Sequence, residues 1–420
     1  MWQYKIKKLL AFSFLLIGTT VSINAYAQTL SMAEAIELAF KQDLSVRQFQ
    51  QKSEALKQQA IAADALPDPK LKLGFMNYPT DTFERTQEPM TQNVIGFQQM
   101  FPAGDTLEIK SKRVLAMSAA ASADAENNQR KLVRDVRKAW LERFYWIKAK
   151  DIVKQNEVLF SELVNITSSQ YAVGRHKQQD VIRAELELGM LQDRISKIET
   201  MNEISQSQLA RLISDTHAQR VLASDLPVLP TVSTQGQWLK SHPLIKKESA
   251  QVVAGENNVS LAKQSYKPSW MLDLSYGQRE GLNMDGSERA DFLSAMLMFD
   301  LPLFTGNFQD KKVAASRLRL NSAQDAREDK KRVLKEMWAK SYAKWTKLSE
   351  RSQQYHNNLI PKAKQNARAS LFDYQNSGGS FNSLVRSQVM ELETQLKAVR
   401  LDVDAKQVQA QLLYLAGEEH

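Results

Sequence analysis

Alternating apolar and polar positions mark four short segments of the sequence as β-strands. In the first segment, Leu71, Leu73 and Phe75 are separated by lysine or glycine. Such a period of two gives a strand one apolar face and one polar face. The four predicted strands cover about 70–78, 93–101, 270–278 and 292–301. A length of about nine to eleven residues suits a tilted strand that crosses a bilayer, but a soluble β-sandwich shows the same alternation, and the pattern alone leaves both structures open.

Apolar residues spaced three and four positions apart predict long helices after each pair of strands. Val133, Val136 and Trp140 follow this spacing, which places them on one helical face. The predicted helices cover about 104–171, 180–213, 306–374 and 382–416. At 1.5 Å per residue, each of the two longer helices reaches about 100 Å, which no ordinary globular fold accommodates. Each shorter helix is expected to pack against the preceding long helix as a coiled coil.

The same order of elements occurs twice along the chain, which identifies an internal repeat. Residues 67–75 align with residues 268–276 at an offset of about 201. An intervening segment that contains Pro227 and Pro230 matches neither copy, so we expect a linker there. The predicted organisation is a first structural repeat, a linker and a second structural repeat, which cover 28–214, 215–236 and 237–420.

The first 27 residues have the pattern of a cleavable secretory signal peptide. Three lysines precede an apolar run over residues 9–17, and Ala25-Tyr26-Ala27 forms a cleavage site with small residues at its first and third positions. The mature chain is then expected to begin near Gln28 and to be exported, with a retained N-terminal anchor as the alternative. Export argues against chromosomal DNA as a partner.

The composition supports long uninterrupted elements and excludes several kinds of chemistry. Only 15 glycines and 11 prolines occur in 420 residues, and there is no cysteine. Disulfides, thiolate metal sites, thiol nucleophiles and a lipid-modified N-terminal cysteine are therefore excluded. The sequence has no phosphate-binding loop, nucleophile elbow or histidine pair with metal-ligand spacing, so we predict no enzyme activity, cofactor or metal site. The formal net charge of +9 is not gathered in a basic block interleaved with aromatic residues, which argues against nucleic-acid binding.

Strands that cross a membrane have to meet a further condition, because lipid offers no hydrogen-bond partner to an unpaired backbone group. A membrane sheet therefore has to close on itself, and the smallest bacterial barrels have about eight strands. The four strands of one chain cannot close a barrel. Several chains would have to contribute, and each chain would form one sector of a larger tube.

Short motifs mark the junctions between the predicted strands and helices. The motif Tyr171-Ala172-Val173-Gly174 is followed by Asp180-Val181-Ile182-Arg183-Ala184 after the first long helix. Further motifs lie at the strand-to-helix corners and at the last helix end, in residues 99–104, 303–306 and 412–417. Together with the duplicated order of elements, these motifs resemble the TolC-like outer-membrane factor family (outer membrane efflux proteins) over nearly all of the mature chain.

This resemblance implies a fold class that is mainly α with a membrane β-barrel. Three chains would form a homotrimer with a twelve-stranded barrel in outer-membrane lipid and an α-helical tunnel in the periplasm. The implied partners are a periplasmic adaptor (membrane fusion protein) and an inner-membrane RND-type pump, for which the trimer would be a passive exit duct. Residues 88–91 and 99–102 look most like the heavy-metal cation efflux branch. A multidrug efflux or type I protein secretion duct has the same fold, and a periplasmic coiled-coil scaffold or adhesin is the alternative from another class.

The resemblance also places the functional residues at the periplasmic tip, where the helical hairpins turn. The predicted aperture and adaptor-docking residues are Tyr171, Gly174, Arg175, Asp180, Arg183, Tyr374, Gly378, Gly379 and Arg386. The aperture of the family is often ringed by acidic residues, and Asp180 fits that pattern, whereas the second copy has Ser383 at the matching position. We hypothesise that Asp180 and Arg386 from neighbouring hairpins hold the tip closed. An ordinary surface pair of Asp180 with Arg183 is the alternative.

Methionine is frequent in and near the predicted strands, at positions 76, 90, 100, 284, 296 and 298. Thioether sulfur is a soft ligand that suits Cu(I), which would fit a metal relay. Methionine is used more often as an adaptable filler of apolar surface. The sequence alone favours the second role, and no metal-binding residue is predicted.

Overall fold

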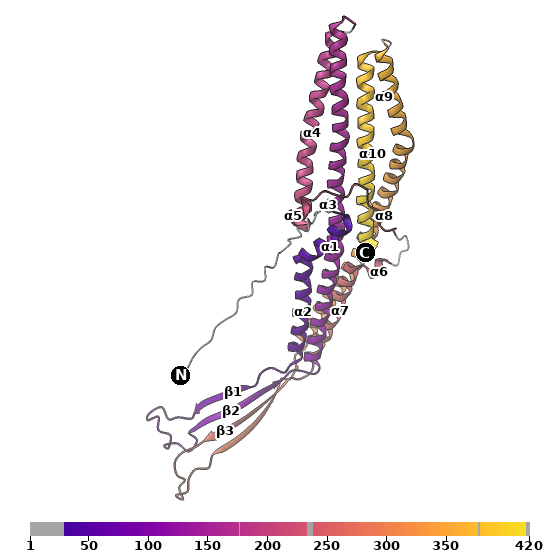
Figure 1. Cartoon of the computed structure of the whole chain (residues 1–420). Coiled ribbons are helices and arrows are strands. Elements are labelled where there is room, and N and C mark those ends of the chain that lie inside the picture. Colours follow the sequence, from indigo (N-terminus) through magenta and orange to yellow (C-terminus); the bar gives the residue numbers. More distant parts are fainter. Residues whose placement is uncertain (1–28, 176, 233–237, 377–378, 417–420) are drawn as a thin grey trace, which may run out of the picture.

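The computed structural model describes residues 29–175, 177–232, 238–376 and 379–416. The predicted signal peptide lies outside the described residues. The chain forms an elongated helical body, and a four-stranded sheet extends from one end of it (Figure 1). No helix in these described ranges is both long and apolar enough to span a membrane.

Helices account for most of the described chain. They are α1 (Met32–Gln42), α2 (Leu44–Asp64), α3 (Thr106–Ala172), α4 (Gln178–Ile213), α5 (Asp215–Ala218), α6 (Trp238–Ser241), α7 (Pro243–Gln264), α8 (Gln309–Gln354), α9 (Ile360–Gln375) and α10 (Phe381–Ala416). A π-helical turn, η1 (Tyr355–Leu359), separates α8 from α9. The strands are β1 (Lys70–Met76), β2 (Gln92–Phe101), β3 (Trp270–Gln278) and β4 (Phe292–Phe299). The prediction of a mainly helical chain with long helices and four antiparallel strands is confirmed.

The strands form one antiparallel sheet in the order β1-β2-β3-β4, and their register keeps its two faces chemically distinct. One row of cross-strand partners is apolar and consists of Leu73, Ile95, Tyr276 and Leu293. The neighbouring row, on the opposite face, consists of Lys72, Gly96, Ser275 and Ser294. All four members of the apolar row are exposed. Within the part of the chain that the structure describes, this apolar sheet face is uncovered, and β1 and β4 are the edges of the sheet.

An ion pair crosses the polar face of the sheet. Lys72 Nζ of β1 lies 3.2 Å from Asp273 Oδ2 of β3, and Asp273 is buried. Gly96 of β2 lies between these strands, and a Cβ atom there would approach the Ser275 Cβ to 3.0 Å and the Leu274 carbonyl oxygen to 3.1 Å. A Cβ atom at this position would therefore be crowded by β3.

The long helix α3 is the centre of the helical body and packs against α2, α4, α7 and α10. Trp140, near its middle, is fully buried. The indole Nε1 of Trp140 donates a hydrogen bond to the Leu30 carbonyl at 3.1 Å, so this buried polar atom is satisfied. This contact fixes the start of the described chain against α3.

The segment between the two repeats is part of the core. The sequence predicts a linker over 215–236, but its described part contains the short helix α5, and Leu222 and Leu229 are buried in the apolar cluster around α3. The buried Arg143 of α3 donates a hydrogen bond to the Ala218 carbonyl. Prolines and polar residues give this segment the composition of a loop. Its leucines nevertheless pack into the core and hold the segment in place.

The second long helix differs from the prediction of one continuous element over 306–374, because the π turn η1 separates α8 from α9. Pro361 explains the difference, since it has no N–H to donate to the carbonyl four residues earlier and its ring crowds that carbonyl. A π turn accommodates such an interruption within a helix. His356 Nε2 of this turn lies 2.8 Å from Asp402 Oδ2 of α10, which holds the irregular turn against the neighbouring helix.

The lack of space at position 96 gives a testable prediction. We expect Gly96→Ala to destabilise the sheet by about 1–3 kcal/mol, as overpacking does in other proteins. Gly74→Ala is the matched control. Gly74 of β1 lies on the same face of the sheet as Gly96, and a Cβ there would have no atom within 4 Å. Thermal melting followed by circular dichroism compares the purified variants. Equal melting temperatures would show that space at Gly96 is not limiting.

Candidate functional site at the hairpin tips

Two helical hairpins end side by side, at the end of the body that lies farthest from the sheet (Figure 1). Helices α3 and α4 form the first hairpin, and α9 and α10 form the second. One apolar cluster of buried residues joins them and includes Leu163, Ala184, Leu384 and Leu392. The two hairpins therefore pack as one unit rather than as independent arms.

The first hairpin turns through a Schellman motif, in which a left-handed residue follows the last helical turn. Gly174 is that residue, with φ +73°. The Gly174 N–H donates to the Tyr171 carbonyl at 2.9 Å, and the Arg175 N–H donates to the Gln170 carbonyl at 2.9 Å. A Cβ at Gly174 would meet nothing within 4 Å, so the backbone angle, and not space, requires glycine here.

The second hairpin turns with a close approach of its own backbone. The Gly379 N–H donates to the Asp373 carbonyl at 3.1 Å. A Cβ at Gly379 would lie 3.1 Å from both the Asp373 Cβ and the Tyr374 backbone nitrogen. Glycine at this position therefore lets the chain return close to the end of α9. Gly378, the other glycine predicted for this turn, lies outside the described residues.

Tyr171 and Tyr374 occupy corresponding positions in the two copies of the internal repeat, but their environments are opposite. Tyr171 is 46% exposed, whereas Tyr374 is 2% exposed and packs against Phe381 of α10, with ring centroids 5.6 Å apart. Burial raises the pKa of Tyr374 to about 12, and the negative charge of Asp180 adds to this rise. The charge of Asp180, near the start of α4, therefore influences the hydroxyl group of Tyr374 at the end of α9, where the two hairpins meet.

Arg183 provides a second link between the hairpins. Its guanidinium group donates a hydrogen bond to the side-chain oxygen of Asn382, at the start of α10. The spacing in the sequence suits a pair with Asp180 on the same helix, but the structure directs Arg183 to the other hairpin. The sequence does not single out Asn382, because a polar residue in a polar turn has no distinguishing pattern. Arg175 and Arg386 are exposed on the surface of the two tips.

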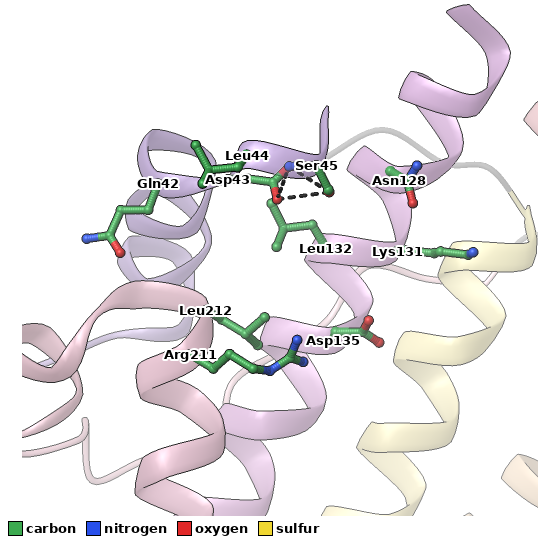
Figure 2. Close-up of a pocket in the computed structure, with 10 residues that line it drawn as sticks. All are labelled: Gln42, Asp43, Leu44, Ser45, Asn128, Lys131, Leu132, Asp135, Arg211 and Leu212. Carbon is green, nitrogen blue, oxygen red and sulfur yellow. Dashed lines mark hydrogen bonds between the residues drawn. The ribbon is translucent and has the colours of Figure 1, made fainter. Parts of the chain in front are cut away.

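A second candidate is a pocket of about 360 Å³ at the junction of α1 and α2 (Figure 2). Two carboxylates line it, and each one has a structural partner. Asp43 accepts the Val46 N–H at 2.8 Å and caps α2, while the guanidinium group of Arg134 donates to Asp135 at 2.8 Å. Within the described ranges, no group of three or more histidine, cysteine, aspartate or glutamate side chains could hold a metal ion. This pocket therefore lies at a junction of helices, and its carboxylates are engaged in structural contacts rather than directed at a common ligand.

Comparison with known proteins finds similarity at the level of structure. No protein-family model matches the sequence, and no curated protein matches it. The solved outer-membrane channel OprN has a TM-score of 0.77 at 15% identity, with 92% of this chain and 90% of that chain covered. CusC, which forms a transmembrane channel, has a TM-score of 0.79 at 14% identity, with 92% of each chain covered. The outer membrane protein VceC of Vibrio cholerae has a TM-score of 0.76 at 16% identity, with 92% of this chain and 96% of that chain covered.

These similarities establish the class of fold. The chain has the TolC-type fold of outer-membrane channels, with long helices and four antiparallel strands. The fold that the sequence motifs imply is thereby confirmed. Because the sequence identities are only 14–16%, these similarities show the fold alone.

The Schellman turn gives a prediction about the first tip. We expect Gly174→Ala to destabilise the turn by about 1–2 kcal/mol, because a Cβ disfavours the left-handed backbone. Hydrogen exchange of the Gly174 and Arg175 amides should then accelerate about tenfold. Gly189→Ala on α4 is the control, since that glycine is helical with nothing within 4 Å of its missing Cβ, and alanine should slow exchange around it. Unchanged exchange at Arg175 in the first variant would contradict the proposed strain.

Proposed function

We propose that this chain is the outer-membrane channel of a tripartite efflux system, a passive exit duct with no enzymatic step. The observation that carries the proposal is the sheet, whose apolar face is uncovered in a chain with the fold of outer-membrane channels. Apolar surface in water costs about 25 cal/mol per Å². Insertion of this face into lipid removes that cost, and a soluble chain would have to bear it.

Assembly of three chains supplies partners for the edges of the sheet. Neighbouring strands alternate in direction, so β1 of one chain and β4 of the next would run antiparallel and could pair. Three sheets of four strands then make one barrel of twelve, with no unpaired edge in lipid. In this barrel the row with Leu73 and Leu293 faces lipid, and the face with the Lys72–Asp273 ion pair lines the lumen.

The helical body would extend from this barrel into the periplasm. Helix α3 has 67 residues, which corresponds to about 100 Å. The hairpins of three chains would surround a tunnel, with the two kinds of tip at its far end. The exposed side chains of Tyr171, Arg175 and Arg386 suit docking of a periplasmic adaptor, which connects the duct to an inner-membrane RND-type pump. The signal peptide predicted over 1–27 would direct the chain to export.

Closure of the tip would depend on contacts between chains. The shared apolar cluster and the hydrogen bond from Arg183 to Asn382 hold the two hairpins of one chain together. Opening would therefore separate hairpins of different chains. Arg386 is exposed and Asp180 is half-buried, so each can contribute to a charged contact with a neighbouring chain.

The substrate is a finer part of the proposal. The likeness of residues 88–91 and 99–102 to the heavy-metal cation efflux branch favours metal cations. A multidrug efflux or type I protein secretion duct is the second candidate, because it uses the same fold. A periplasmic scaffold or adhesin is disfavoured, since it would leave the apolar face of the sheet in water.

Recordings in planar lipid bilayers test the channel. We expect the purified protein to migrate as a heat-modifiable trimer and to form channels of low conductance, because the proposed charged contacts would hold the tip closed. Asp180→Ala should raise the single-channel conductance by removing a charged contact at the tip. Glu203→Ala, which changes an exposed carboxylate farther along α4, is the matched control and should leave the conductance unchanged.

Two outcomes would count against the proposal at different levels. Recovery of the chain in the soluble periplasmic fraction, or a membrane-inserted trimer with no conductance, would contradict the channel itself. An active wild-type channel whose conductance is the same in Asp180→Ala would contradict only the role of Asp180.

A further inference from the structure

Three methionines form a row across neighbouring strands, close to the end of the sheet that joins the helices. The register pairs Met100 of β2 with Met271 of β3, and Met271 with Met298 of β4. Directly opposed residues on one face have Cβ atoms about 4.5–5.5 Å apart, which brings their long side chains within reach of one ion. Met296 lies two residues from Met298 on the same face of β4 and adds a fourth thioether.

Packing does not account for this row, because it lies on the polar face of the sheet. The adjoining row on that face contains Gln98 and Asp273. Met100, Met298 and Met296 are 47%, 42% and 57% exposed. Methionine that fills gaps in a core is surrounded by apolar groups, whereas these side chains lie among polar residues and are open to water.

We propose that Met100, Met271 and Met298, assisted by Met296, bind a soft monovalent cation such as Cu(I) or Ag(I). Thioether sulfur is a soft neutral donor that selects such ions over Zn²⁺, Mg²⁺ or Ca²⁺. The strands contain neither cysteine nor histidine, and their one further thioether, Met76, pairs with Gln92 at the other end of the sheet. Asp273, the carboxylate in the adjoining row of this face, is paired with Lys72 and does not favour a hard cation.

The place of this site in transport rests on the proposed function. If the polar face lines the lumen of a trimeric barrel, the three copies of the row surround the lumen where the helical tunnel enters the barrel. Conduction requires binding that is favourable enough to admit an ion and weak enough to release it. Neutral thioethers that are half exposed meet this requirement better than a buried thiolate cage. The row would thus pass soft cations from the tunnel into the barrel.

Titration of the purified trimer with Ag(I) tests the site. Calorimetry should give about one Ag(I) per chain, and X-ray absorption should show a coordination shell of sulfur. The test variant is Met100→Leu/Met271→Leu/Met298→Leu, which conserves apolar volume. We expect this variant to bind Ag(I) roughly 10–100-fold more weakly or worse. Loss of an outer-shell partner alone has an effect of that size, and here the ligands themselves are removed. Zn²⁺ should not bind to the wild-type protein.

The matched control is Met117→Leu/Met190→Leu/Met337→Leu, which removes three exposed thioethers from the helices and should leave Ag(I) binding unchanged. Equal affinity in the two triple variants, or a wild-type Ag(I) shell without sulfur, would overturn the site. Potassium conductance of each variant, measured in planar bilayers, separates this inference from the proposed function. A conducting trimer that binds no Ag(I) overturns the site alone, whereas Ag(I) bound through sulfur to a chain that never conducts supports the site and overturns the channel.

Discussion

The edges of a four-stranded sheet impose the constraint on which the rest of the structure depends. In the described part of the chain, β1 and β4 each have one side without a partner strand, and in the proposed channel lipid cannot satisfy the backbone groups on that side. Pairing with other chains is the solution that leaves no edge. Because each pair of strands leads into a long helix, the number of chains that closes the proposed barrel would also set the number of hairpins around the proposed tunnel. In that assembly, closure of the barrel and width of the tunnel would be set by the same number of chains.

The two repeats share their order of elements and differ where they make contacts. Tyr171 is exposed, whereas Tyr374 is buried. Gly174 adopts a left-handed backbone conformation, whereas Gly379 allows a close approach of the backbone to the end of α9. These differences leave the tyrosine of the first tip open to solvent, whereas the tyrosine of the second tip packs against Phe381 of its own hairpin. The two copies of the duplicated unit therefore share an order of elements while their tips differ in burial.

Patterns that extend over many residues were sufficient to place the main elements. Strand alternation predicted β3 over 270–278, where it is found, and apolar spacing predicted α3 to within two residues at each end. Features that depend on contacts between distant residues were not predictable in the same way. The packing of Leu222 beside Leu30 and the hydrogen bond from Arg183 to Asn382 leave no periodic signal. The methionine row likewise depends on strand register, which sequence spacing does not reveal.

Hydrogen exchange at the edge strands tests the closed barrel most directly. The outward-facing amides of β1 and β4 should be as strongly protected as the paired amides of β2 and β3 in the purified, membrane-inserted protein, because each edge pairs with a neighbouring chain. Exchange at β1 and β4 that is orders of magnitude faster than at β2 and β3 would show open edges and contradict the assembly of three chains into one barrel.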